Sequence, residues 1–163
     1  MPSLIVADSG PLIAFALIGQ LDLLNELFDE VIITESVKDE TTSDASLRGA
    51  RAISNQIRMG KITVTNDVKS SLYEKAVESL DIGEAESISL ASRLGCRVFI
   101  DEKKGRTFAK KNHLAVVGTL GLLIKAKELG YIGQIEPLIT RLESCGYRYS
   151  DKLVRAALKA AGE

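Results

Sequence analysis

The sequence predicts an α/β fold, in which helices cover both faces of a mostly parallel sheet of about five strands. Two observations predict this class. Five short apolar runs rich in β-branched residues recur along the chain, and segments with helical periodicity separate them. Strands that alternate with helices in this way pair in parallel through right-handed crossovers, which gives a three-layer α/β/α arrangement.

The five expected strands lie at 4–7, 31–34, 61–65, 97–100 and 115–118. The first expected helix spans 12–28 and should break near Gly19. The remaining helices are expected at 36–41, 47–59, 68–80, 83–94, 105–112, 120–129, 135–145 and 151–160. The stretch TTSDASLRG, at 41–49, has no apolar period and predicts a loop.

Length and composition favour one domain over residues 1–163. The chain is long enough for a sizeable core, and its hydrophobic share of 45% with 26% charged residues is typical of globular proteins. We expect the helices of 134–160 to pack on this domain or extend it, and the final residues KAAGE to fray.

Net charge, cysteines and hydropathy exclude several classes of protein. A net charge of −1 and an aromatic share of 5% without Trp do not indicate a general nucleic-acid binder. Cys96 and Cys145 have no metal-binding or redox spacing, so we expect buried free thiols. No apolar stretch approaches the ~20 residues of a membrane span. We therefore expect a cytoplasmic protein with no membrane association.

Two expected strands are followed directly by an aspartate. Asp8 follows the strand at 4–7, and Asp101 follows the strand at 97–100. Ligands of open α/β sheets bind beyond the carboxyl ends of the strands. Glu40 and Glu84 lie in a short helix after the second strand and in the first turn of a later helix. Acids at such positions also cap helices and complement the helix dipole, and for Glu84 alone we weigh that structural role equally.

Four carboxylates at one edge of a sheet repel one another unless a cation joins them. All-oxygen ligation selects Mg²⁺ or Mn²⁺, because no Cys/His set offers a zinc site. Such ions suit hydrolysis of phosphodiester bonds by metal-activated water, with one or two ions at the site.

Three segments carry a family resemblance. They are IVADSGPLIAFALIGQLDLLNELF at 5–28, VIITESVKDE at 31–40, and LDIGEAESISLASRLGCRVFIDEKKGRTFAKKNHLAVVGTLGLLIKAKELGYI at 80–132. In this order and spacing, the chain resembles PIN-domain proteins, and specifically the small prokaryotic branch of VapC-like toxins from VapBC toxin–antitoxin pairs.

The resemblance implies which residues form the site. Asp8, Glu40, Glu84 and Asp101 match the catalytic and metal-binding acids, with Asp39 as the alternative to Glu40. Ser9 matches the supporting hydroxyl, and Glu102 stands near a variable last acid. Many members have Asp in place of Glu84, and Thr or Ser in place of Ile100. From its position, Thr119 is expected to line the same crevice.

The resemblance also implies an activity and partners: a Mg²⁺- or Mn²⁺-dependent endoribonuclease without a covalent nucleophile, with an RNA substrate, a cognate antitoxin and a homodimeric state. The departures at Glu84 and Ile100 leave a non-catalytic RNA- or protein-binding module as the alternative. A phosphohydrolase that forms an aspartyl-phosphate is disfavoured, because Ser9 and Gly10 follow Asp8 where a DxD acid pair is needed.

A basic run follows Asp101 directly. Lys103, Lys104, Arg106 and Lys110, together with Lys111, either form a solvated helix face or contact RNA phosphates beside the acids. Arg106 is our best candidate for a direct phosphate contact. His113, the one histidine of the chain, is expected to be structural, because water activated by a metal ion needs no imidazole base.

Overall fold

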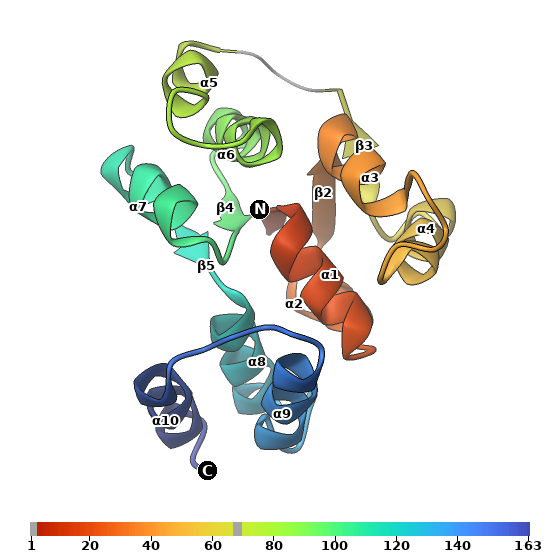
Figure 1. Cartoon of the computed structure of the whole chain (residues 1–163), viewed down its shortest axis with the longest axis vertical. Helices are drawn as coiled ribbons and strands as arrows, with labels where there is room; N and C mark the ends of the chain where they lie inside the picture. Colours follow the sequence, from red (N-terminus) through yellow and green to blue (C-terminus); the bar gives the residue numbers. More distant parts are fainter. Residues whose placement is uncertain (1–2, 67–69) are drawn as a thin grey trace.

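The computed structural model of the protein describes residues 3–66 and 70–163. Its sheet has five strands: Leu4–Ala7 (β1), Glu30–Thr34 (β2), Thr63–Thr65 (β3), Arg97–Phe99 (β4) and Val116–Val117 (β5). Their order is β3-β2-β1-β4-β5, and every pair of neighbours is parallel. The predicted three-layer α/β/α class is confirmed, with a sheet that is parallel throughout (Figure 1).

The helices follow the predicted order. They are Ser9–Leu17 (α1), Asp22–Leu27 (α2), Glu35–Thr42 (α3), Ala50–Arg58 (α4), Ser71–Ala76 (α5), Ile82–Leu94 (α6), Lys103–Lys111 (α7), Thr119–Glu128 (α8), Glu136–Ser144 (α9) and Asp151–Ala160 (α10). The expected break falls between α1 and α2, at Gly19 with φ of +69°. Helix α1 begins earlier than predicted, because Pro11 fits the first turn of a helix. Residues 68 and 69 of the helix expected at 68–80 lie outside the described residues, and α5 ends at Ala76.

Alternate side chains of each strand enter two separate cores. On β1, Ile5 and Ala7 join a core that also includes residues of α1, α2, α8 and α9. Val6 points to the opposite face and joins a core with residues of α5, α6 and α7. These helices lie on the two sides of the strand row in Figure 1. The rings of Phe15 on α1 and Phe99 on β4 pack edge to face, with centroids 5.2 Å apart, and so fix α1 over the strand ends.

The C-terminal helices complete the first core. Ile139 and Leu142 of α9 and Ala157 of α10 are buried in it. The expected fraying of the chain end is not observed. Glu163 accepts a hydrogen bond from the Ile135 backbone N–H at 2.8 Å and pairs with Lys127 at 3.2 Å. Glu163 therefore provides a hydrogen-bond acceptor for a backbone N–H at the start of α9, where the N-cap residue makes no side-chain cap hydrogen bond.

Three other expectations have simple outcomes. Between α3 and α4, residues 43–49 form no helix or strand, as predicted for this loop. Cys96 and Cys145 are free thiols, but both are partly exposed rather than buried. Within the described residues, no helix has the length and apolar character needed to cross a membrane.

Candidate active site

Asp8 and Asp101 leave neighbouring strands at the same edge of the sheet. Ala7 of β1 is in register with Phe99 of β4, and the Asp8 backbone N–H donates to the Phe99 carbonyl at 2.9 Å. Because β1 and β4 are parallel, both chains turn into their next helices on this side. The two aspartates therefore both lie at the carboxyl edge of the sheet, as the sequence predicts.

Asp8 occupies the N-cap position of α1 but makes no side-chain cap hydrogen bond. The residue is 6% exposed, and its Oδ1 has no hydrogen-bond partner among the described residues. The pKa of this carboxyl is raised to about 7, chiefly by burial and in addition by the charges of Glu84, Asp81 and Glu40, against a lowering by a hydrogen bond from the Ser9 backbone. Capping does not account for Asp8, because its side chain makes no cap hydrogen bond and lies buried beside other acids.

Glu40 reaches Asp8 through Ser9. The Ser9 hydroxyl donates to Glu40 Oε2 at 2.7 Å and joins the starts of α1 and α3. Helix α3 is set in place by Thr34, whose hydroxyl accepts from the Val37 backbone N–H at 3.2 Å. Asp39, the alternative acid, is exposed, whereas the charge of Glu40 is among those that raise the pKa of Asp8. The geometry therefore places Glu40 rather than Asp39 against the site.

Glu84 takes the capping position that the sequence allowed, and it also lies near other acids. It forms a capping box with Asp81, whose Oδ1 accepts from the Glu84 N–H at 2.8 Å, while Glu84 Oε2 accepts from the Asp81 N–H at 3.3 Å. Glu84 is also buried, and its pKa is raised by burial first, then by Asp81, Glu102 and Glu40. One carboxylate oxygen thus starts α6, and the same group belongs to the acidic cluster.

Asp81 lies near the predicted acids but was not predicted from the sequence motifs. Its charge raises the pKa of both Asp8 and Glu84, and its side chain caps the N-terminus of α6. The spacing Asp-x-x-Glu at 81–84 was the available signal, since it is the capping-box pattern before an apolar helix.

Asp101 is held by Thr119 at the start of α8. The Thr119 backbone N–H donates to Asp101 Oδ1 at 2.8 Å, and its hydroxyl donates to Oδ2 at 2.5 Å. A Cβ at Gly118 would lie 2.8 Å from both Asp101 Oδ1 and Arg106 Nη1. Gly118 therefore lets these two charged groups approach, and Arg106 is fixed beside Asp101 by donating to the Ile100 carbonyl at 2.9 Å.

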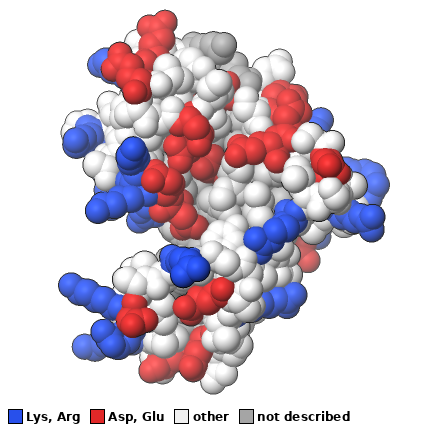
Figure 2. All heavy atoms as spheres, viewed as in Figure 1, with Lys and Arg blue, Asp and Glu red and all other residues white. Residues whose placement is uncertain are grey.

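The remaining predicted residues lie around this centre. Glu102 caps α7 by accepting from the Gly105 N–H at 3.0 Å, and its charge also raises the pKa of Glu84. Ile100, one of the two departures from the family pattern, is fully buried in the core between β4 and α7. Lys103, Lys104 and Lys110 are exposed on α7, as is His113 just after it. Figure 2 shows acidic side chains across the middle of the visible face, with basic side chains on both sides.

The acidic side chains of the site are of the chemical type that binds a hard divalent cation. As the side chains stand, no three His, Cys, Asp or Glu residues of the described chain are grouped to hold a metal ion. The acids nevertheless offer oxygen ligands only, which Mg²⁺ and Mn²⁺ prefer. The buried Asp8 oxygen without a hydrogen-bond partner is the atom that such a cation would satisfy.

A parallel sheet of this order, with carboxylates at its carboxyl edge, is an open α/β fold with its candidate site at the strand ends. The family model DUF3368, a PIN domain, matches residues 4–163. The chain therefore belongs to the PIN-domain family, whose members are generally nucleases that use divalent metals.

Solved structures agree with the fold at low sequence identity. A PilT N-terminus domain protein from Sulfolobus solfataricus P2 is 16% identical with a TM-score of 0.50, over 76% of this chain and 92% of its own. The protein PAE2754 from Pyrobaculum aerophilum is 16% identical with a TM-score of 0.54, over 77% of this chain and 97% of its own. None of the curated proteins matches the chain.

Proposed function

We propose that the protein is a metal-dependent endoribonuclease and the toxin of a VapBC-like toxin–antitoxin pair. The observation that supports this most is Asp8, a buried carboxylate at the strand edge that caps nothing and has one oxygen without a hydrogen-bond partner in the described structure. Burying an ionised carboxylate without a compensating charge costs on the order of several kcal/mol. A buried acid that is retained in spite of this cost is typically part of a functional site.

In this proposal, Asp8, Glu40, Glu84 and Asp101 hold Mg²⁺ or Mn²⁺. A cation held there would supply Lewis-acid activation of water. Ser9 and Thr119 orient Glu40 and Asp101 through the hydrogen bonds described above. Arg106, beside Asp101, and the lysines of α7 offset the repulsion between the acids and the RNA backbone.

Cleavage of a labelled single-stranded RNA in Mn²⁺ or Mg²⁺ tests this proposal. Asp8→Asn and Asp101→Asn should each reduce the rate by roughly 100-fold or more, because each removes an anionic ligand. Glu128→Gln is the matched control, since Glu128 lies exposed on α8 and pairs only with Lys125 in the structure. Thermal unfolding checks that each variant folds. Equal cleavage by the parent and both aspartate variants would show that the site is not catalytic.

A non-catalytic PIN-fold module that binds RNA or a protein is the second candidate. It is favoured by one observation: the described acids are not grouped to hold a metal ion as they stand. Calorimetric titration with Mn²⁺ separates the two proposals. Binding at micromolar to millimolar concentration that is lost in Asp8→Asn supports the nuclease, whereas absence of binding at millimolar Mn²⁺ supports the module.

For the toxin role, we propose a cytoplasmic protein, a homodimer, and a cognate antitoxin whose segment occupies the acidic groove. Expression of the chain alone should then arrest bacterial growth, and Asp8→Asn should relieve the arrest. A small protein encoded next to the gene should co-purify with the chain and inhibit it. Unchanged growth with a chain that cleaves RNA in vitro would argue against a toxin while leaving the nuclease in place.

A further inference from the structure

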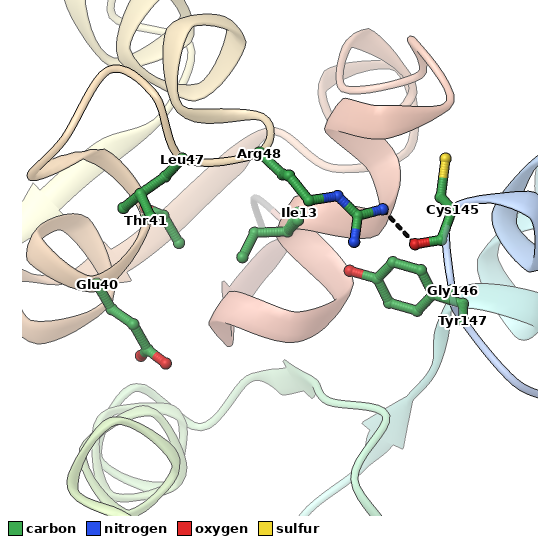
Figure 3. Close-up of a pocket in the computed structure, with 8 residues that line it drawn as sticks. All are labelled: Ile13, Glu40, Thr41, Leu47, Arg48, Cys145, Gly146 and Tyr147. Carbon is green, nitrogen blue, oxygen red and sulfur yellow. Dashed lines mark hydrogen bonds between the residues drawn. The ribbon is translucent and has the colours of Figure 1, made fainter.

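A hollow of about 420 Å³ adjoins the carboxylate cluster, and Glu40 is part of its lining. Four segments line it, and Figure 3 shows their side chains: Ile13 of α1, Glu40 and Thr41 of α3, Leu47 and Arg48 of the loop before α4, and Tyr147 of the segment between α9 and α10. The size lies within the range of pockets that bind small ligands. The family motifs include neither Arg48 nor Tyr147.

Tyr147 is fixed at the start of α1. Its hydroxyl donates to the Gly10 carbonyl at 3.0 Å, across 137 residues of sequence, and Gly10 is two residues after Asp8. The side chain is half-buried, so the ring is held in place at the wall of the hollow. An aromatic ring in a fixed position next to a phosphodiester site is a platform on which an unstacked base can lie.

Arg48 lies beside this ring. Its guanidinium donates one hydrogen bond to the Cys145 carbonyl, and the residue is exposed to solvent. Since a guanidinium carries five N–H donors, donors remain for a ligand. Figure 3 shows Arg48 and Tyr147 on one side of the hollow and Glu40 on the other, so the guanidinium lies away from the Glu40 carboxylate.

The lip of the hollow is apolar. Leu47 is 41% exposed although it is a large aliphatic side chain, and Ile13 lies between it and Tyr147 in Figure 3. A fixed aromatic ring, an exposed aliphatic side chain and an arginine together match the parts of a nucleotide, with an apolar base face at one end and a phosphate at the other.

We propose that this hollow binds one unstacked nucleotide of single-stranded RNA that flanks the cleaved phosphate. Its base packs on Tyr147 and Leu47, and its phosphate pairs with Arg48. The proposal rests on the proposed ribonuclease function and names a substrate subsite for it. The competing explanation is that Arg48 and Tyr147 only fasten the segment between α9 and α10 to the start of α1.

Binding of a fluorescein-labelled 12-nucleotide single-stranded RNA, followed by anisotropy in EDTA, tests the subsite without cleavage. Tyr147→Leu should weaken binding roughly tenfold, because stacking on the ring is lost. Tyr147→Phe keeps the ring but loses the hydrogen bond to Gly10, so it should bind within about twofold of the parent. Tyr131→Leu is the matched control, since Tyr131 is 46% exposed in the connection after α8.

The salt dependence tests the phosphate contact. Arg48→Gln should flatten the slope of log affinity against log salt by about 0.7, the value for one phosphate contact to a single strand, and Arg48→Lys should restore it. Arg58→Gln on α4 removes the same charge from an exposed position and should leave the slope unchanged. Thermal unfolding of each variant reports on the fastening role.

The outcomes separate the subsite from the alternatives. The subsite is overturned if Tyr147→Phe loses as much RNA affinity as Tyr147→Leu, or if Arg48→Gln behaves like Arg58→Gln. If the protein cleaves RNA in Mn²⁺ but binds it independently of Arg48 and Tyr147, the proposed nuclease function is supported and the proposed subsite is overturned. A protein that binds RNA through both residues but never cleaves it keeps the subsite and loses the nuclease.

Discussion

The Ser9 hydroxyl donates to the Glu40 carboxylate at 2.7 Å and so connects the residue next to Asp8 with an acid 31 residues away. Glu40 is exposed, and this hydrogen bond is what directs its carboxylate toward Asp8.

Ser9→Ala should therefore weaken metal-dependent cleavage by about tenfold, which is typical of a residue that orients a metal ligand. The loss should shrink as Mn²⁺ is raised, because the ligand itself is retained. The measurement is the cleavage rate as a function of Mn²⁺ concentration. Ser46→Ala, which removes a hydroxyl bonded to Asp44 in the exposed loop, serves as the control. A loss that is the same at every Mn²⁺ concentration would contradict this role.

The raised pKa of Asp8 predicts a pH-dependent cost to the metal-free protein. Its pKa is about 7 in the folded state and 3.8 ordinarily, so the folded state holds an extra proton between these values. Stability should fall as pH rises through this window, and the cost is fully present above pH 7. Asp8→Asn removes the cost, and should stabilise the protein in EDTA by about 2–4 kcal/mol at pH 8.

Urea unfolding in EDTA at pH 4.5 and pH 8 measures this effect. The difference between Asp8→Asn and the parent should be large at pH 8 and small at pH 4.5. Glu26→Gln, on the exposed face of α2, should show no comparable change. An equal difference at both pH values would mean that burial of the Asp8 charge carries no penalty.

Gly118 predicts a steric effect on catalysis. A Cβ at this position would lie 2.8 Å from Asp101 Oδ1 and from Arg106 Nη1, so Gly118→Ala should displace both groups. A displacement of this kind costs roughly 10- to 100-fold in rate. Gly121 lies inside α8, which Gly118 precedes, and a Cβ there meets only a Val117 methyl group at 3.5 Å, so Gly121→Ala should stabilise α8 by about 0.5–1 kcal/mol without loss of rate. Cleavage rates and unfolding midpoints of the two variants distinguish these outcomes.

The elements that carry the site could be predicted because local patterns determine them. The strand at 4–7 matches β1, and the parallel pairing of β1 with β4 then brings Asp8 and Asp101 to one edge. The capping pattern around Glu84 is also local, and its capping role is confirmed, whereas its role as a site acid stays a prediction.

The contacts that cross the chain could not be predicted in this way. Tyr147 meets Gly10 across 137 residues, and Arg48 meets the Cys145 carbonyl across 97. No periodicity or motif in one sequence relates positions so far apart, because their meeting depends on how α8, α9 and α10 pack on the sheet. The contacts of Glu163 with Ile135 and Lys127 are also distant in sequence, so the sequence alone predicted fraying at this end.

Glu163 closes the fold at that end, and its removal should destabilise the protein. Its carboxylate accepts from the Ile135 N–H and pairs with Lys127, and these contacts lower its pKa. The stabilisation is therefore present above its ordinary pKa of 4.5, and is lost as pH falls through the lower value in the folded protein. Glu163→Ala should lower the unfolding midpoint at pH 7 and converge with the parent in acid, whereas Glu128→Ala, from an exposed pair on α8, should not. An unchanged midpoint for Glu163→Ala at pH 7 would show that the chain end contributes nothing to the packing of α9.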